Sequence, residues 1–219
     1  MSKFRSTVIF FFFLAASVLF CVAQTSTVAN IGALADTTVS TGLRNALQPQ
    51  GSRVTINGSV VAEIWLRQSL PARDKTDVPD VIYPQLAESA LVAVISFPAP
   101  ATDYRGEAIK PGTYTLRYQL LPEDGNHLGV APNRDFLLLI PVASDSDPDA
   151  TYKFDQLVSL SRQATGTRHP APMSMVAPSA GNEPTISKDI DEHWIFSAKL
   201  KSGTTGLPLA FVVQGTAPQ

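Results

Sequence analysis

The sequence has few residues of the types that bind metals or act as nucleophiles. Among 219 residues it has three histidines and one cysteine, Cys21. Cys21 lies in an N-terminal segment that we expect to be removed, so the mature chain has no disulfide, no reactive thiolate and no cysteine metal ligand. Its stability must therefore come from a hydrophobic core, which a chain of roughly 200 residues is large enough to bury.

The usual hydrolase motifs are also missing. No serine lies in a Gly-x-Ser-x-Gly or Ser-x-x-Lys motif, and no His-x-His or His-Glu-x-x-His pair is present. Removal of residues 1–23 takes away Lys3 and Arg5 and leaves 15 basic against 19 acidic residues, a net charge of −4. This acidic balance argues against nucleic acid and anionic membranes as partners.

The N-terminal segment has the three parts of a secretory signal peptide. Basic Lys3 and Arg5 precede an apolar run over residues 8–20, and the small residue Ala23 follows. The run is too short for a comfortable membrane span, and a small residue favours cleavage directly after it. We therefore expect a secreted protein, periplasmic or extracellular, that keeps no membrane attachment once residues 1–23 are removed.

The rest of the chain divides into a leader and one β domain. Residues 24–51 are mostly small and polar, which is typical of a flexible leader, and residues 41–47 predict a short helix within it. Over residues 52–217, short apolar or alternating runs are separated by proline and glycine turns. We predict a mainly β fold, an antiparallel β-sandwich or distorted barrel of about seven to nine strands with one or two short helices.

Two strand predictions are specific. Asn57-Gly58 favours a type I′ hairpin turn, in a register that places Val54 opposite Val61. Residues 113–120 alternate, so one side of that strand is expected to be buried and the other to face solvent. The side expected to face solvent carries Thr113, Thr115, Arg117 and Gln119.

Other segments predict buried elements. Residues 90–97 and 136–140 are almost continuously apolar, which is typical of strands covered on both faces. Residues 152–165 have apolar side chains at helical spacing before a glycine, which predicts a helix. Trp194 and Phe196 lie on one side of an alternating segment and are expected in the core.

The turn Lys110-Pro111-Gly112-Thr113-Tyr114-Thr115-Leu116 resembles the PAGTY-type turn of secreted bacterial β-sandwich domains of unassigned function. The segments at residues 124–139 and 63–67 look like uncharacterised secreted proteins of soil bacteria. This resemblance implies a β-sandwich and a periplasmic or extracellular location. It implies no activity and no catalytic residues.

The densest polar loop of the chain supplies most candidate ligand-binding residues. They are Asp124, Asn126, His127, Asn133, Arg134 and Asp135. His127 with Asp124 or Asp135 offers mixed nitrogen and oxygen ligands for a metal, although a zinc site needs further ligands that converge in the fold. The alternative is that Asn126 and His127 stabilise a turn and that Arg134 and Asp135 form a structural ion pair.

Glu63 is a further candidate because it lies between Ala62 and Ile64 in an otherwise apolar strand. If the carboxylate is buried, its pKa is raised, as in many functional sites. The alternative is that Glu63 faces solvent, or that it pairs with Arg67 or another arginine.

Three aspartates have the spacing that begins a calcium loop: Asp145, Asp147 and Asp149. Ala150 stands where the loop requires glycine, and Gln156 stands where it requires a bidentate glutamate. A solvated acidic loop, with Asp149 or Thr151 capping the next helix, is the simpler interpretation.

Together these observations favour a non-catalytic secreted protein with no cofactor and no metal. Its expected ligand is a small molecule, a glycan or an envelope protein, bound through loops at one end of the domain. The alternative is a metal-assisted hydrolase that uses His127 with Asp124 or Asp135.

Overall fold

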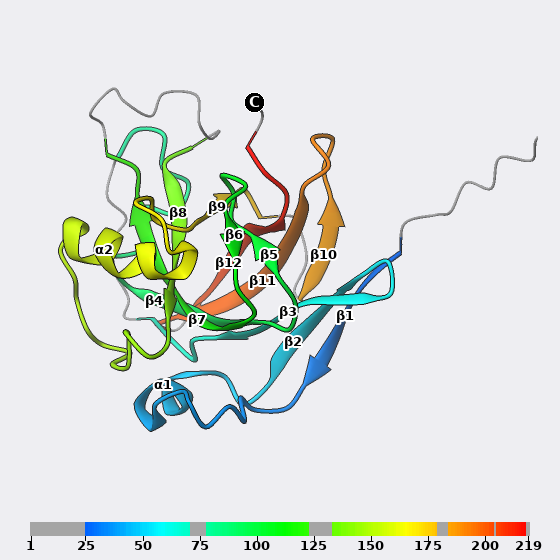
Figure 1. The fold of residues 1–219 in the computed structure, drawn as a ribbon, viewed down its shortest axis with the longest axis horizontal. Coiled ribbons are helices and arrows are strands. Elements are labelled where there is room, and N and C mark those ends of the chain that lie inside the picture. The colour runs from blue at the N-terminus through cyan, green and yellow to red at the C-terminus, as the bar shows by residue number, and fades with distance from the viewer. Residues whose placement is uncertain (1–24, 71–77, 123–132, 179–183, 204, 218–219) are drawn as a thin grey trace, which may run out of the picture.

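The computed structural model describes residues 25–70, 78–122, 133–178, 184–203 and 205–217 (Figure 1). The predicted signal peptide, residues 1–23, and the loop residues Asp124, Asn126 and His127 lie outside the described residues. In the part of the chain that is described, no helix has the length and apolar character needed to cross a membrane.

Ten strands form one antiparallel sheet. They are β1 (Ser26–Ile31), β2 (Gly51–Ile56), β3 (Ser59–Leu66), β4 (Leu91–Phe97), β7 (Gly112–Leu120), β8 (Asp135–Pro141), β9 (Pro172–Val176), β10 (Thr185–Lys188), β11 (Trp194–Ser202) and β12 (Thr205–Gln214). Their order in the sheet is β1-β2-β3-β4-β7-β8-β9-β12-β11-β10. The two edge strands approach each other, so the sheet curls into a nearly closed, barrel-like shape (Figure 1).

One short strand pair and two helices complete the fold. Strands β5 (Ala101–Thr102) and β6 (Ala108–Ile109) form a separate two-stranded sheet. The helices are α1 (Thr41–Ala46) and α2 (Phe154–Thr165). The predicted class, a mainly β antiparallel fold with short helices, is confirmed, in the distorted-barrel form of the two that were expected.

Strand β1 corrects the prediction of a flexible leader over residues 24–51. Its six residues pair with β2, from Ser26 opposite Ile56 to Ile31 opposite Gly51. The pattern is weak in the sequence because β1 is an edge strand with mostly exposed or half-buried side chains. The short helix predicted after it is confirmed as α1, where Ser40 Oγ accepts a hydrogen bond from Leu43 N.

The hairpin of β2 and β3 confirms the predicted turn but corrects its register. Asn57 has φ 50° and Gly58 has φ 80°, the left-handed values that a type I′ turn requires. A bulge between Val54 and Thr55 places Val54 opposite Ala62, one residue beyond the expected partner.

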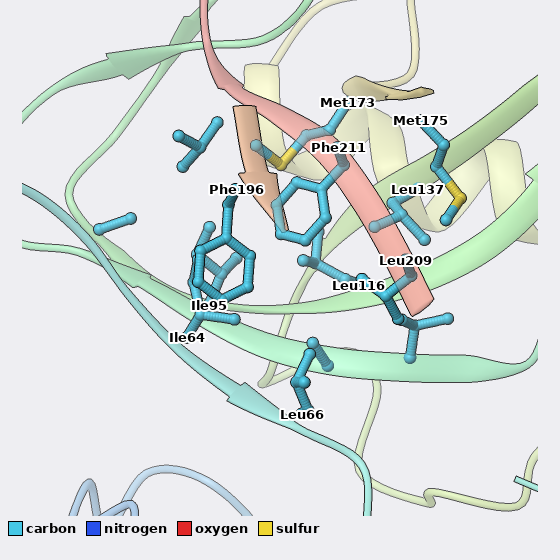
Figure 2. Close-up of a cluster of buried hydrophobic side chains, with 14 of the residues drawn as sticks. Ile64, Leu66, Ile95, Leu116, Leu137, Met173, Met175, Phe196, Leu209 and Phe211 are labelled. Carbon is cyan, nitrogen blue, oxygen red and sulfur yellow. The ribbon is translucent and has the colours of Figure 1, made fainter. Parts of the chain in front are cut away.

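The interior of the barrel is filled with side chains. Figure 2 shows Ile64, Leu66, Ile95, Leu116, Leu137, Met173, Met175, Phe196, Leu209 and Phe211 packed together from strands around the sheet. All are buried, and Phe196 and Phe211 form a tilted ring pair with centroids 5.5 Å apart. The packed interior explains why the chain needs no disulfide.

Strand β8 is covered on both faces, as predicted from its continuous apolar run. Leu137 and Leu139 belong to the barrel interior, whereas Leu138 and Ile140 pack outward against Leu157 of α2. Figure 1 shows α2 lying against the outside of the barrel beside β8. The predicted helix and the glycine at its end are both confirmed, with Gly166 at φ 71°.

The face of β7 that was expected to meet solvent is buried instead. Arg117 is fully buried, and its five N–H groups donate to Asp145 twice and to the carbonyl oxygens of Ser89, Ala150 and Asp147. The segment before α2 therefore folds across β7, and Arg117 makes five of the hydrogen bonds that hold it there. The alternating pattern predicted that this face of β7 is exposed, because a local pattern does not reveal a covering segment from elsewhere in the chain.

We call the contacts of Arg117 with the segment before α2 the clamp. They also determine the role of Asp145. Its carboxylate accepts hydrogen bonds from Thr115 Oγ1 at 2.6 Å and from Tyr152 OH at 3.0 Å in addition to those from Arg117. Asp145 is therefore a structural residue, not the first ligand of a calcium loop. The predicted helix caps are also corrected, because α2 begins after Lys153, whose backbone N–H donates to Gln156 Oε1.

Candidate functional site

Asp135, predicted as a ligand-binding or metal-binding residue, has a structural position. The residue is fully buried at the start of β8, and its carboxylate accepts hydrogen bonds from Ile82 N, Tyr83 N and Tyr118 OH at 2.9, 3.0 and 2.7 Å. Burial, reinforced by this carboxylate, raises the pKa of Tyr118. Asp135 thus fastens residues 82–83 to the barrel, and its oxygens are already occupied.

Asn133 and Arg134 take part in the same fastening. Asn133 Nδ2 donates to Met175 O at 2.9 Å, and Asn133 Oδ1 accepts from Asp135 N at 2.9 Å. Arg134 Nε donates to Leu121 O at 2.8 Å. The structure therefore brings these three predicted residues together, although the Asp135 contacts with backbone amides and Tyr118 replace the expected pairing with Arg134.

Glu63 lies in a different place, on the outer face of the barrel. It pairs directly across the strands with Arg53, and both Arg53 Nε and Nη2 donate to Glu63 Oε1 at 2.7 Å. The Glu63 side chain is 24% exposed and that of Arg53 is 47% exposed. Glu63 is thus the half-exposed, arginine-paired residue that was one of the two alternatives.

Glu63 belongs to a row of polar residues that crosses four strands. Arg53 on β2 lies opposite Glu63 on β3, Glu63 opposite Ser96 on β4, and Ser96 opposite Thr113 on β7. We call these four residues the polar row. Its sequence signal is a single polar residue in an otherwise apolar strand, as at Glu63 and Ser96, but the register that joins them is visible only in the structure.

Asp36 closes one end of the polar row. Its Oδ2 accepts from Thr113 Oγ1 at 2.7 Å, and its Oδ1 accepts from Thr38 N and Thr38 Oγ1 at 2.9 and 2.6 Å. These hydrogen bonds, with that of the Thr38 side chain the largest, hold the pKa of Asp36 below its usual value. Asp36 could not be selected from its sequence context, because it lies in the segment predicted to be a flexible leader.

The polar row and the segment at residues 31–36 border a shallow, solvent-open depression of about 260 Å³. We call this depression the hollow. Trp65 forms part of its lining and is held in place because its Nε1 donates to Gly32 O at 2.9 Å. Within the described residues, Arg53 Nη1 and Glu63 Oε2 make no hydrogen bond, so the hollow offers both a cationic donor and an anionic acceptor.

The histidines do not all come together. Among the described residues, the one group of three or more potential metal ligands is Asp189, Asp191 and His193. His169 is described but does not belong to this group. Because His127 lies outside the described residues, the proposed combination with Asp124 or Asp135 stays a prediction.

Comparisons with family models, curated proteins and solved structures find no match to this chain. The resemblance to secreted bacterial β-sandwich domains therefore stays a prediction.

Proposed function

We propose that this protein is a secreted, non-catalytic binding protein whose ligand is a small molecule held in the hollow. The observation that carries the proposal is the Arg53–Glu63 charge pair at one end of the polar row, in which one arginine nitrogen and one carboxylate oxygen have no hydrogen-bond partner among the described residues. The packed barrel interior supports an external site, because the buried core side chains take up the space inside the sheet.

The size of the hollow narrows the class of ligand. At about 260 Å³ it falls just below the range of roughly 300–1,000 Å³ typical of drug-sized ligands. A small zwitterion, such as a free amino acid, fits this space and pairs its carboxylate with Arg53 and its ammonium group with Glu63.

The hydrolase alternative has less support. Asp135, one of its two candidate carboxylates, uses both oxygens to hold residues 82–83 and Tyr118. A ligand that needs those oxygens must break three hydrogen bonds in a fully buried position. The export proposal rests on the signal-peptide features of residues 1–23.

The test is a thermal-shift and calorimetric titration of the purified protein with free amino acids. We expect at least one amino acid to raise Tm in a saturable way and Glu63→Gln to remove the effect. Glu192→Gln is the matched control because it breaks the exposed Lys188–Glu192 ion pair elsewhere on the molecule. A panel of monosaccharides run in parallel distinguishes the glycan alternative, and no binding by any amino acid contradicts the proposal.

A further inference from the structure

A second site lies far along the chain, in the loop that joins β10 to β11. Asp189 Oδ1 accepts hydrogen bonds from Asp191 N and His193 N at 3.0 and 2.8 Å, which leaves Asp189 Oδ2 directed at the histidine ring. Asp191 is exposed, Asp189 is half-buried and His193 is only 6% exposed. The ligand atoms of these three residues all lie within 4.8 Å of one another.

The His193 ring is fixed by groups outside this loop. Its Nε2 lies 2.9 Å from Thr216 O, and the ring packs against Tyr104 with centroids 5.6 Å apart. Gly215 has φ +138°, and a Cβ there would lie 2.6 Å from His193 Cδ2, so only glycine permits this approach. The chain therefore holds a buried imidazole in one orientation, as metal-binding proteins hold their histidine ligands.

The hydrogen-bond partner of Nε2 determines whether Nδ1 of the neutral ring carries a proton or a lone pair. A carbonyl oxygen only accepts, so Nε2 must carry the proton that it donates to Thr216 O. In the neutral ring, Nδ1 then presents a lone pair to Asp189 Oδ2, which is also an acceptor, at 3.1 Å. Two acceptors that face each other at this distance need either a second ring proton or a cation between them.

The position of the two atoms allows a cation to take the place of the second ring proton. The Nδ1···Oδ2 separation of 3.1 Å lies within the range of about 2.7–3.2 Å for N–H···O hydrogen bonds. Tetrahedral zinc, with bonds of about 2.0–2.2 Å, holds neighbouring ligand atoms about 3.3–3.6 Å apart, so a small outward movement of the two side chains admits the ion. The exposed Asp191 carboxylate, which has no hydrogen-bond partner of its own among the described residues, is close enough to complete a third ligand by a change of side-chain rotamer.

We propose that His193 Nδ1, Asp189 Oδ2 and Asp191 bind a divalent transition-metal ion of the zinc type, with water at the remaining position. One imidazole with two carboxylates is a ligand set that suits zinc better than calcium, which prefers an all-oxygen shell. Glu192 is ion-paired with Lys188, so the two carboxylates of Asp189 and Asp191 leave the loop with a net negative charge. This site is independent of the hollow.

The test is calorimetric titration of the untagged protein with zinc sulfate. We expect saturable binding of one ion per chain, at least tenfold weaker binding in Asp191→Asn, and none in His193→Gln. Asp191 is exposed, so its variant folds even if the His193 variant does not. His169→Gln is the matched control and should bind zinc as the parent does.

A thermal-shift series with the same variants gives a second measurement, since an ion that binds only the folded state raises Tm. The proposal is overturned if zinc binding is not saturable or if Asp191→Asn binds with unchanged affinity. The proposal is also overturned if binding is lost only in His169→Gln or His127→Gln, because the ion then binds at a site that contains another histidine.

Discussion

Asp103 holds a carboxylate in a position that disfavours its charge. The residue is 1% exposed, and its Oδ1 accepts hydrogen bonds from Arg105 N and Glu107 N at 2.9 and 2.8 Å. Its Oδ2 is buried and has no hydrogen-bond partner among the described residues. Burial raises the pKa of Asp103 from its usual value near 3.8 to about 6.

This shift predicts a pH dependence of stability with a definite sign. Between pH 4 and pH 6 the unfolded chain has lost the Asp103 proton while the folded protein keeps it. The contribution of Asp103 to the free energy of unfolding therefore falls as the pH rises. Asp103→Asn keeps the Oδ1 acceptor and removes the charge. We expect its free energy of unfolding, relative to the parent, to increase from pH 4 to pH 7 in urea titrations.

Asp36 provides a control of opposite sign. Hydrogen bonds from Thr38 and Thr113 lower the pKa of Asp36. Its stabilising contribution to the free energy of unfolding is therefore present above pH 4 and is lost as the pH falls. The stability of Asp36→Asn relative to the parent should therefore decrease from pH 3 to pH 7. Equal slopes for the two variants would contradict a raised pKa at the buried Asp103 carboxyl.

The Asn57-Gly58 turn gives a second residue-scale prediction. Both residues have positive φ, and a Cβ added at position 58 meets no heavy atom within 4 Å, so the expected cost of a side chain there is backbone strain. We expect Gly58→Val and Asn57→Ala each to lower the free energy of unfolding by about 1 kcal/mol or more. Denaturation midpoints equal to that of the parent would rule out the strained turn.

At the scale of elements, the clamp between β7 and the segment before α2 depends on one buried ion pair. Arg117 and Asp145 are both fully buried. Asp145→Ala leaves a buried guanidinium unpaired, and we expect a loss of about 3–5 kcal/mol in chemical denaturation. Replacing both partners, as Arg117→Met with Asp145→Leu, should cost less than the single change.

The Arg67–Asp149 ion pair in the same segment is the matched control. The Asp149 side chain is 76% exposed, so solvent screens the interaction. Asp149→Ala should therefore change stability by less than about 1 kcal/mol. Similar losses for Asp145→Ala and Asp149→Ala would mean that the buried clamp does not hold this segment.

Elements with a strong local signal were predictable from the sequence. The turn at Asn57-Gly58, the helix that ends at Gly166 and the doubly covered strand β8 each depend on residues close together in the chain. Edge strand β1 was missed because its exposed side chains lack a clear alternation. The burial of Arg117 was missed because it depends on Asp145 from a distant segment.

The candidate site was predictable only in part, for the same reason. Glu63 could be selected as a polar residue in an apolar strand, but Arg53, Ser96 and Thr113 join it through strand register. Asp36 reaches the site from a loop that precedes α1. Asp135 was selected for its polar surroundings, which do not reveal that its oxygens are already hydrogen-bonded.

For the whole molecule, stability should depend on the packed interior of the barrel. Phe196 is fully buried and packs against Phe211 on the neighbouring strand β12, so Phe196→Ala leaves a cavity and should cost about 3–5 kcal/mol. Ile190→Ala is the matched control, because Ile190 is 94% exposed and its removal should change stability little. Equal melting temperatures for the two variants would contradict a tightly packed interior.

The central claim is that ligand binds outside the barrel, in the hollow, and the two tryptophans of the chain test it directly. Trp65 lines the hollow, whereas Trp194 belongs to the core cluster. Fluorescence titration with free amino acids should change the emission of Trp194→Phe, which keeps Trp65, and leave Trp65→Phe unchanged. A response confined to Trp194, or no response in either variant, would contradict the account.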